Sequence, residues 1–179
     1  MASTEYVALL RAINVGTGRK VPMADLRALM ADAGATGVET YIQSGNVVFA
    51  HAADDETALR ADLEERLEAA FGFAIPVLLR TAGDLAALVA GNPFPVAEPT
   101  RPLVSFLRAA PPPGALDGLD AVAFAPEAFV LAGREIYLDL PAGAGRAKLP
   151  QALARAHGLQ ETTRNWRTVL QLLEMAQRR

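Results

Sequence analysis

Tyr41-Ile-Gln-Ser-Gly-Asn-Val-Val-Phe49 is the stretch from which the rest of the fold can be predicted. Residues that favour β-structure flank three residues that favour turns, so the pattern predicts a strand, a tight turn and a second strand. A strand pair this short is only marginally stable by itself. The sequence on either side must therefore supply more sheet and a covering layer of helix.

The segments around this hairpin predict alternating strands and helices. An apolar run over residues 5–15 is typical of a central strand, and the spacing of apolar residues over 23–33 predicts an amphipathic helix. Residues 54–71 carry leucines four apart, which predicts a second helix. Residues 74–79 predict a strand, and Pro76 within it indicates that this strand lies at an edge of the sheet. The order strand, helix, strand, strand, helix, strand is that of a ferredoxin-like βαββαβ unit.

A connector with four prolines over residues 91–102 separates this unit from the rest of the chain. Beyond it the pattern predicts a strand over 103–107, a hairpin of 128–131 with 135–140, a helix over 150–157 ended by Gly158, and a last helix over 163–177. The inner face of the last helix is predicted to carry Trp166, Val169, Leu170 and Leu173.

The predicted fold class is α+β, with two ferredoxin-like subdomains, the second degenerate, and a C-terminal helix. The first subdomain and its trailing helix span residues 1–91. The Pro-rich connector spans 92–102, and the second α+β subdomain with the C-terminal helix spans 103–179.

Composition narrows the function classes. The 179 residues are 51% hydrophobic and 21% charged, which is an ordinary globular balance. No apolar stretch approaches the ~20 residues that a membrane helix needs, and the start of the chain lacks the features of a signal peptide. We expect a cytoplasmic protein without a membrane partner, and without disulfides or thiol chemistry because the chain has no cysteine.

Charge and histidine content bear on partners and metals. The formal net charge of −3 disfavours a globally basic nucleic-acid binder, although it leaves a local basic patch possible. With no cysteine and only His51 and His157, the chain has too few ligands for a zinc site of the usual kind, so no metal is expected.

The topology of a βαββαβ unit predicts where polar residues meet. Its first and second strands are parallel with the third between them, so the end of the first strand, the start of the first helix and the hairpin turn lie at one sheet edge. This edge is predicted to collect Arg11, Asn14, Gly16, Gly18, Arg19, Lys20, Gln43, Ser44 and Asn46. The free N–H groups of the helix also point there, which suits an anion. The alternative is that these residues only satisfy turn geometry, with Arg11 in a structural ion pair.

Two glycine-rich loops support an anion site. Gly16-Thr-Gly-Arg-Lys-Val-Pro22 and Gly143-Ala-Gly-Arg-Ala-Lys-Leu-Pro150 both follow a predicted strand and precede a predicted helix. Glycines let backbone N–H groups approach an anion, and Arg146 with Lys148 repeats the arginine and lysine of the first loop. Neither loop is a Walker A sequence or a dinucleotide-binding fingerprint. The alternative is that such turns recur by chance.

A third polar cluster is Thr162-Thr-Arg-Asn-Trp-Arg-Thr168. Thr162 or Thr163 is predicted to cap the last helix, which places Arg164 and Asn165 in its first turn. A cation at this position opposes the helix dipole, so we expect Arg164 to hold a carboxylate or a phosphate.

Several of these segments together resemble a known bacterial family, domain-of-unknown-function family 1697. The segments are Tyr6-Val-Ala-Leu-Leu-Arg-Ala-Ile-Asn-Val-Gly16, Lys20-Val-Pro-Met23, Tyr41-Ile-Gln-Ser-Gly-Asn46, Asn92-Pro-Phe94 and Thr163-Arg-Asn-Trp166. The resemblance implies an α+β chain of two ferredoxin-like subdomains and brings no established activity. Thr17 stands where the family usually has a glycine, and Ala147 stands where a serine is common.

Three functional hypotheses follow. The first is a cytoplasmic protein that binds a phosphorylated small molecule or nucleotide through its Gly-Arg-Lys loops. The second is an enzyme acting on such a molecule, although no general base and no cofactor can be named. The third is a nucleic-acid-binding module that uses Arg146, Lys148, Arg164 and Arg167 as a phosphate track, which the net charge disfavours. The sequence does not identify a protein partner.

Overall fold

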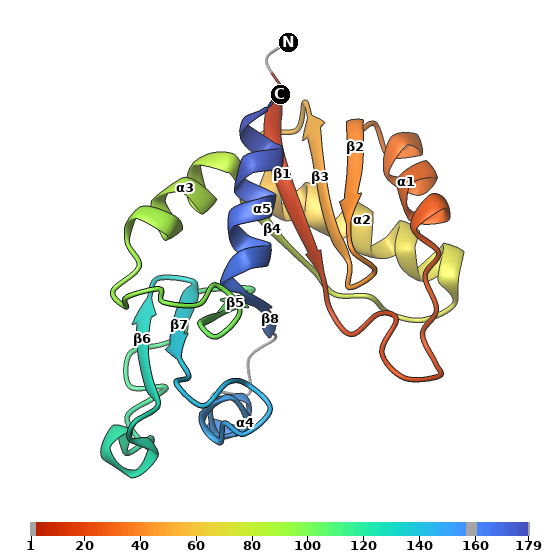
Figure 1. Cartoon of the computed structure of the whole chain (residues 1–179). Helices are drawn as coiled ribbons and strands as arrows, with labels where there is room; N and C mark the ends of the chain where they lie inside the picture. Colours follow the sequence, from red (N-terminus) through yellow and green to blue (C-terminus); the bar gives the residue numbers. More distant parts are fainter. Residues whose placement is uncertain (1–2, 157–160, 179) are drawn as a thin grey trace. The chain divides into compact units, whose positions relative to one another are not determined.

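The computed structural model describes residues 3–156 and 161–178. The chain divides into two compact units (Figure 1): unit 1 comprises Met1–Ala86 with Leu172–Arg179, and unit 2 comprises Ala87–Gln171. The domain boundaries expected after residues 91 and 102 stay a prediction.

Unit 1 contains a complete βαββαβ series. Its elements are β1 (Thr4–Leu10), α1 (Met23–Asp32), β2 (Thr36–Tyr41), β3 (Asn46–His51), α2 (Glu56–Phe71) and β4 (Val77–Thr81), and α3 (Ala82–Ala90) runs from unit 1 into unit 2. The sheet order is β2-β3-β1-β4, and all neighbours are antiparallel. This is the ferredoxin-like topology, so the prediction for the first half is confirmed.

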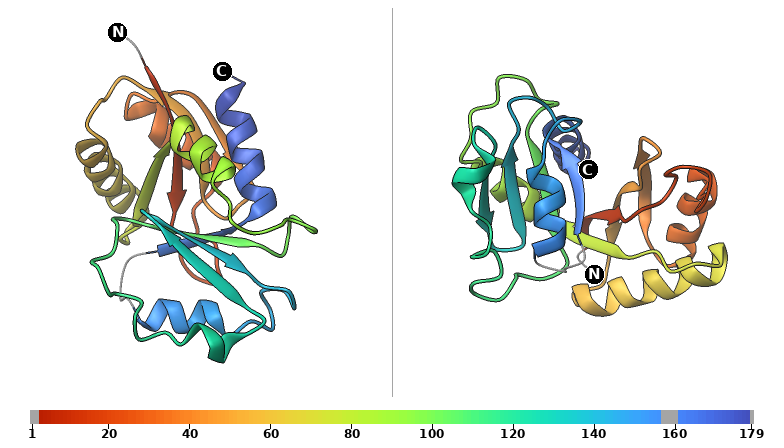
Figure 2. Two further views of the ribbon diagram at one scale, coloured as in Figure 1. Left: turned by 90° about the vertical axis from the view of Figure 1, so that its left-hand side faces the viewer. Right: turned by 90° about the horizontal axis from the view of Figure 1, so that it is seen from below.

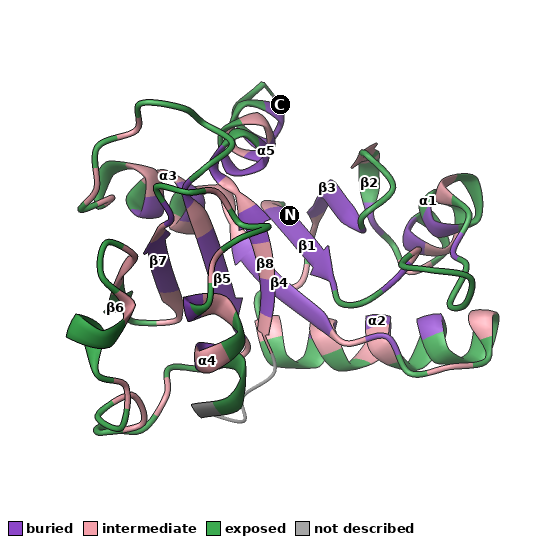
Figure 3. Ribbon diagram, turned by 60° about the horizontal axis from the view of Figure 1, so that its bottom comes forward, coloured by how far each residue is buried: buried purple, intermediate pink, exposed green. Residues whose placement is uncertain are grey.

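The core of unit 1 lies between one face of the sheet and the helices α1 and α2. Alternate residues of β1, among them Tyr6 and Leu10, face one side of the sheet. Leu26 of α1 and Leu63 of α2 are fully buried in the same cluster, so both helices cover that face (Figure 2, right). Figure 3 shows β1, β3 and β4 buried along most of their length, whereas the residues of β2 are exposed or intermediate.

Unit 2 repeats this topology in degenerate form. Its elements are β5 (Leu103–Leu107), a 3₁₀ turn η1 (Ala121–Phe124), β6 (Ala128–Ala132), β7 (Glu135–Asp139), α4 (Leu149–Ala156), β8 (Glu161–Asn165) and α5 (Trp166–Gln177), which continues into unit 1. The sheet order β6-β7-β5-β8 corresponds strand for strand to the order β2-β3-β1-β4 of unit 1. The 3₁₀ turn η1 stands where unit 1 has its first helix. Leu149 and Leu153 of α4 pack on one face of this sheet (Figure 2, left). The prediction of a degenerate second subdomain with a C-terminal helix is confirmed.

The sequence interpretation missed one strand and shifted the last helix. Residues 163–165, expected in the last helix, belong to β8, and α5 begins at Trp166. Thr163 pairs with Ser105 of β5, and their hydroxyl oxygens are 2.7 Å apart. The predicted inner face was also partly wrong, because Leu170 is 38% exposed whereas Leu172 is fully buried. His157 and Gly158 lie outside the described residues.

None of the helices in the described part of the chain combines the length and apolarity needed to cross a membrane.

Candidate functional site

One asparagine connects the two loops at the α1 end of unit 1, the first loop (residues 11–22) and the hairpin turn (residues 42–45). The Asn14 side-chain amide donates hydrogen bonds to the carbonyl oxygens of Val21 (3.0 Å) and Gln43 (2.9 Å), and its Oδ1 accepts one from the Val21 N–H (2.9 Å). Its backbone N–H donates to the Arg19 carbonyl at 3.0 Å. The structure thus brings together the end of β1, the start of α1 and the hairpin turn.

A second asparagine fixes the hairpin turn itself. Asn46 is fully buried, and its Nδ2 donates to the Tyr41 carbonyl and to Ser44 Oγ, each at 3.0 Å. The turn also packs against β1, because the Leu10 N–H donates to the Gly45 carbonyl at 2.8 Å. These contacts give Ser44 and Asn46 structural partners within the turn.

The backbone at this edge adopts uncommon conformations. Within the described residues, the non-glycine positions with positive φ are Ala12, Asn14, Arg19 and Ile42, with φ of 56°, 54°, 52° and 49°. All four lie in the first loop or the hairpin turn. Residues in such sparsely populated backbone regions are often found at ligand-binding and active sites. They cost conformational energy, so they persist only where the surrounding structure holds them in place.

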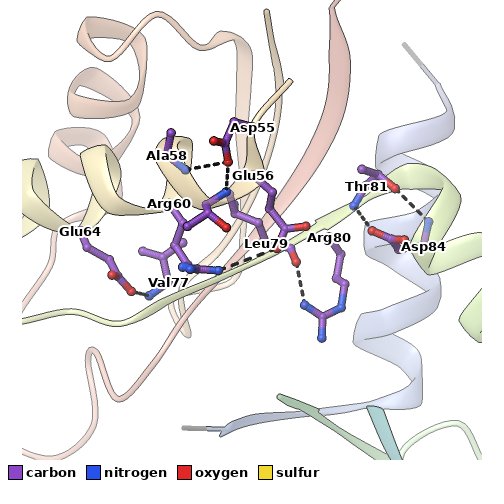
Figure 4. Close-up of polar contacts among 11 residues, drawn as sticks. Asp55, Glu56, Ala58, Arg60, Glu64, Val77, Leu79, Arg80, Thr81 and Asp84 are labelled. Carbon is purple, nitrogen blue, oxygen red and sulfur yellow. Dashed lines mark hydrogen bonds and ion pairs between the residues drawn. The ribbon is translucent and has the colours of Figure 1, made fainter. Parts of the chain in front are cut away.

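Helix α1 differs from the other α-helices of the described residues at its N-terminus. Asp55 caps α2, and a reciprocal pair of hydrogen bonds between Thr81 and Asp84 caps α3 (Figure 4). Asn165 Oδ1 accepts from the Thr168 N–H in α5. At α1 the capping position is Pro22, which offers no side-chain hydrogen bond. The first N–H groups of α1 therefore lack the side-chain acceptor that the other helices have.

A pocket of about 430 Å³ opens at this uncapped end. It is lined by Asn14, Lys20, Val21, Pro22, Met23, Ala24 and Gln43. Within the described part of the chain, the exposed Lys20 side chain makes no hydrogen bond or ion pair. The pocket thus combines the Lys20 ammonium group, the Gln43 side-chain amide and the positive end of a helix dipole, which together favour a bound anion. Both N–H groups of the Asn14 amide already donate to backbone carbonyls.

Other residues predicted for this site lie outside the pocket lining. The Arg19 guanidinium lies over the Phe73 ring, 5.6 Å from its centroid, which is a cation–π contact. Arg11, Gly16 and Gly18 are exposed. Of the predicted set in unit 1, Asn14, Lys20 and Gln43 line the pocket.

The second Gly-Arg-Lys loop belongs to unit 2, where a carboxylate of the chain occupies the helix N-terminus. Both carboxylate oxygens of Glu127 accept from the Lys148 N–H at 3.1 Å, and one also accepts from the Leu149 N–H at 2.8 Å. The side chains of Arg146 and Lys148 are exposed. The loop follows the third strand of its sheet, whereas the first loop follows the first strand, so the two loops are not at equivalent positions.

Replacing Glu127 by alanine is expected to lower the free energy of unfolding by about 1–2 kcal/mol, because it leaves the first N–H groups of α4 without their carboxylate. Urea denaturation followed by circular dichroism measures the loss. Glu98→Ala is the control, since Glu98 forms only an exposed ion pair with Arg101 and should cost less than about 0.5 kcal/mol. Equal effects of the two substitutions would contradict the capping role of Glu127.

The third predicted cluster lies on β8 rather than in the first turn of a helix. Arg164 is 9% exposed and donates to Thr162 Oγ1 (2.7 Å) and to the Thr163 carbonyl (2.9 Å). Burial lowers the pKa of Arg164 to about 10, so the guanidinium stays protonated at neutral pH. Asn165, and not Thr162 or Thr163, caps the following helix. The strand pairing with β5 overrides the helix-start pattern of these residues.

The sequence interpretation missed two parts of these sites. Val21, Pro22, Met23 and Ala24 line the pocket, and a local signal existed, because Val-Pro-Met before a helix supplies no side-chain cap. The Glu127 cap had no such signal, since it lies 21 residues from Lys148. Among the described residues, no group of three or more His, Asp or Glu side chains could hold a metal ion.

A family model described as "Protein of unknown function (DUF1697)" matches residues 3–137. The chain belongs to this family. The matched residues include the first loop and the hairpin turn, and they end before the second Gly-Arg-Lys loop and the cluster on β8. The resemblance noted from the sequence is confirmed.

A solved structure shows the same fold. It is described as that of the conserved bacterial protein SP0830 from Streptococcus pneumoniae, and it superposes with a TM-score of 0.72 over 98% of this chain and 99% of the other. The two sequences are 24% identical, so the likeness concerns the fold alone. No curated protein matches the chain.

Proposed function

We propose that the chain binds a phosphorylated small molecule or nucleotide in the pocket at the N-terminus of α1. The observation that carries this proposal is the combination of an uncapped helix with a pocket that contains Lys20. Backbone N–H groups at a helix N-terminus suit phosphate oxygens, and a lysine adds a full positive charge.

The size of the pocket favours a small ligand over a nucleic acid. Its volume of about 430 Å³ is within the range of about 300–1,000 Å³ that is usual for small-molecule sites. A nucleic-acid track would require several exposed cations in a row, whereas Arg164 is buried and bonded within its own strand. The net charge of −3 also supports the smaller ligand.

The lining residues support binding rather than catalysis. They include no carboxylate and no imidazole, so the pocket offers neither of the commonest acid–base groups. Lys20 and the first N–H groups of α1 therefore hold the phosphate, Gln43 contacts the remainder of the ligand, and Asn14 fixes the position of Gln43.

A thermal-shift screen against nucleotides, sugar phosphates, polyphosphate and short RNA tests the proposal. A ligand at 100 times its dissociation constant should stabilise the protein by about 2.7 kcal/mol. Lys20→Ala should abolish the shift, whereas Lys148→Ala, the matched lysine of the second loop, should leave it unchanged. The absence of a shift with any small phosphate, or equal effects of the two lysine variants, would contradict the proposal.

Pro22→Asp gives a sharper test, because it supplies the carboxylate that the helix lacks. Pro22 has φ −63° and ψ 133°, the extended backbone that a capping residue adopts. An aspartate there should accept from the first N–H groups of α1 and stabilise the free protein by up to about 1 kcal/mol. The same carboxylate should exclude an anionic ligand. We therefore expect a Pro22→Asp protein that is at least as stable as the wild type and is not stabilised further by phosphates. This result would show that binding is lost although the fold is kept.

A further inference from the structure

The strand β6 is an apolar sheet edge without charges. Its sequence is Ala-Phe-Val-Leu-Ala over Ala128–Ala132, and it pairs only with β7 in the sheet order of unit 2 (Figure 1). Val130 is 38% exposed and Leu131 is 39% exposed, although both are large apolar residues. Long apolar edges invite pairing with another strand, so proteins usually protect them.

The other sheet edges of the described residues carry such protection. β2 has a register irregularity between Thr36 and Glu39, and Glu39 also forms an ion pair with Arg178 at 3.5 Å. β4 contains the buried charged residue Arg80, and β8 consists entirely of polar residues. A bulge, a charge, a proline or a polar sequence each discourages addition of a strand. β6 has none of these within its five residues.

The backbone of β6 offers hydrogen-bonding groups on its outer side. Ala132 pairs with Glu135 across a two-residue turn that begins with Gly133 at φ 61°. The pair that closes such a turn is hydrogen-bonded, and antiparallel pairs then alternate. The N–H and C=O groups of Phe129 and Leu131 therefore point away from β7.

We propose that a second copy of this chain pairs with β6 in antiparallel orientation about a two-fold axis at Val130. The strand is nearly palindromic, so Val130 would face Val130 of the partner subunit, and Phe129 would face Leu131 of the partner subunit. Phe129 and Leu131 are the residues whose backbone groups point outward, so each such pair exchanges two hydrogen bonds. A two-fold interface requires this self-complementarity.

Charge supports a copy of this chain as the occupant. A two-fold axis places each residue near its own counterpart, and β6 has no charge that would repel itself. Glu127 precedes the strand and Arg134 follows it. Antiparallel pairing brings the Glu127 end of one copy near the Arg134 end of the other, so like charges do not meet at either end of the shared strand pair, while the Glu127 carboxylate itself stays bound at the N-terminus of α4.

Sedimentation velocity of the full chain at increasing concentration tests this dimer. The wild-type protein should approach twice the monomer mass, whereas Val130→Lys should stay monomeric, because two lysines would face each other across the axis. Val122→Lys is the matched control, since Val122 is an 82% exposed valine outside β6, and this variant should dimerise like the wild type. Circular dichroism should show the same fold for all three proteins.

Charge reversal at the axis tests the register. Val130→Glu should also be monomeric alone, and an equimolar mixture with Val130→Lys should form a heterodimer, because lysine then faces glutamate. A wild-type chain that remains monomeric, or a Val130→Lys variant that still dimerises, would overturn the proposal. Failure of the mixture to dimerise would overturn the pairing about Val130.

Discussion

Replacing Gly45 by alanine is expected to lower the free energy of unfolding by about 2–5 kcal/mol. Gly45 has φ 82°, a conformation that a residue with a side chain adopts only with strain. A Cβ atom at this position would lie 2.8 Å from Leu10 Cβ and 2.9 Å from Ile13 Cδ1. Leu10 and Ile13 are both buried, so neither can move aside without disturbing the core of unit 1.

Gly16→Ala separates the two causes of this effect. Gly16 also has a positive φ, 65°, but no atom lies within 4 Å of the place its Cβ would take. Its replacement by alanine should therefore lower the free energy of unfolding only by the cost of the strained backbone conformation, about 1–2 kcal/mol. Urea denaturation of both variants, followed by circular dichroism, measures the difference. Equal losses would show that β1 and the hairpin turn are less tightly packed than the distances indicate.

The hairpin, the helices and the edge strand of unit 1 could be predicted because their signals are local. Gln43-Ser-Gly-Asn46 combines turn residues between two β-forming segments, and the leucines of α2 recur at helical spacing. Once these elements were placed, the topology alone predicted that the first loop and the hairpin turn would meet. The hydrogen bond from Asn14 to the Gln43 carbonyl shows that contact.

The errors concern features that depend on distant parts of the chain. Thr162 to Asn165 carry the residue types of a helix start, and they form a strand because β5, some 58 residues earlier, pairs with them. Edge strands of polar residues have no hydrophobic alternation to reveal them. The Glu127 cap has the same origin, since the two partners are brought together only by the folded sheet.

Side-chain direction was the part of the candidate site that the sequence could not predict. Arg19 and Lys20 are adjacent and were expected to act together. In the structure Arg19 lies on the Phe73 ring, whereas Lys20 lines the pocket. Their separation depends on the positive φ of Arg19 and on the position of Phe73 beyond α2, and neither can be deduced from composition or spacing.

Replacing Asn14 by alanine is expected to lower the free energy of unfolding by about 2–4 kcal/mol and to remove the response to phosphates. The substitution deletes three side-chain hydrogen bonds, with the Val21 N–H, the Val21 carbonyl and the Gln43 carbonyl. It also forces alanine into φ 54°, a region that asparagine tolerates better. Differential scanning calorimetry with and without ligand measures both effects.

Asn14→Gly separates backbone strain from the lost hydrogen bonds. Glycine adopts φ 54° without strain, although the Asn14→Gly variant lacks the same three hydrogen bonds. Its free energy of unfolding should therefore be about 1 kcal/mol higher than that of Asn14→Ala. Both variants should lose the stabilisation by phosphates although they remain folded, because the hydrogen bond that ties Gln43 to the first loop is gone. A folded Asn14→Gly protein that kept the full ligand shift would show that ligand binding does not depend on the hydrogen bond between Asn14 and the Gln43 carbonyl.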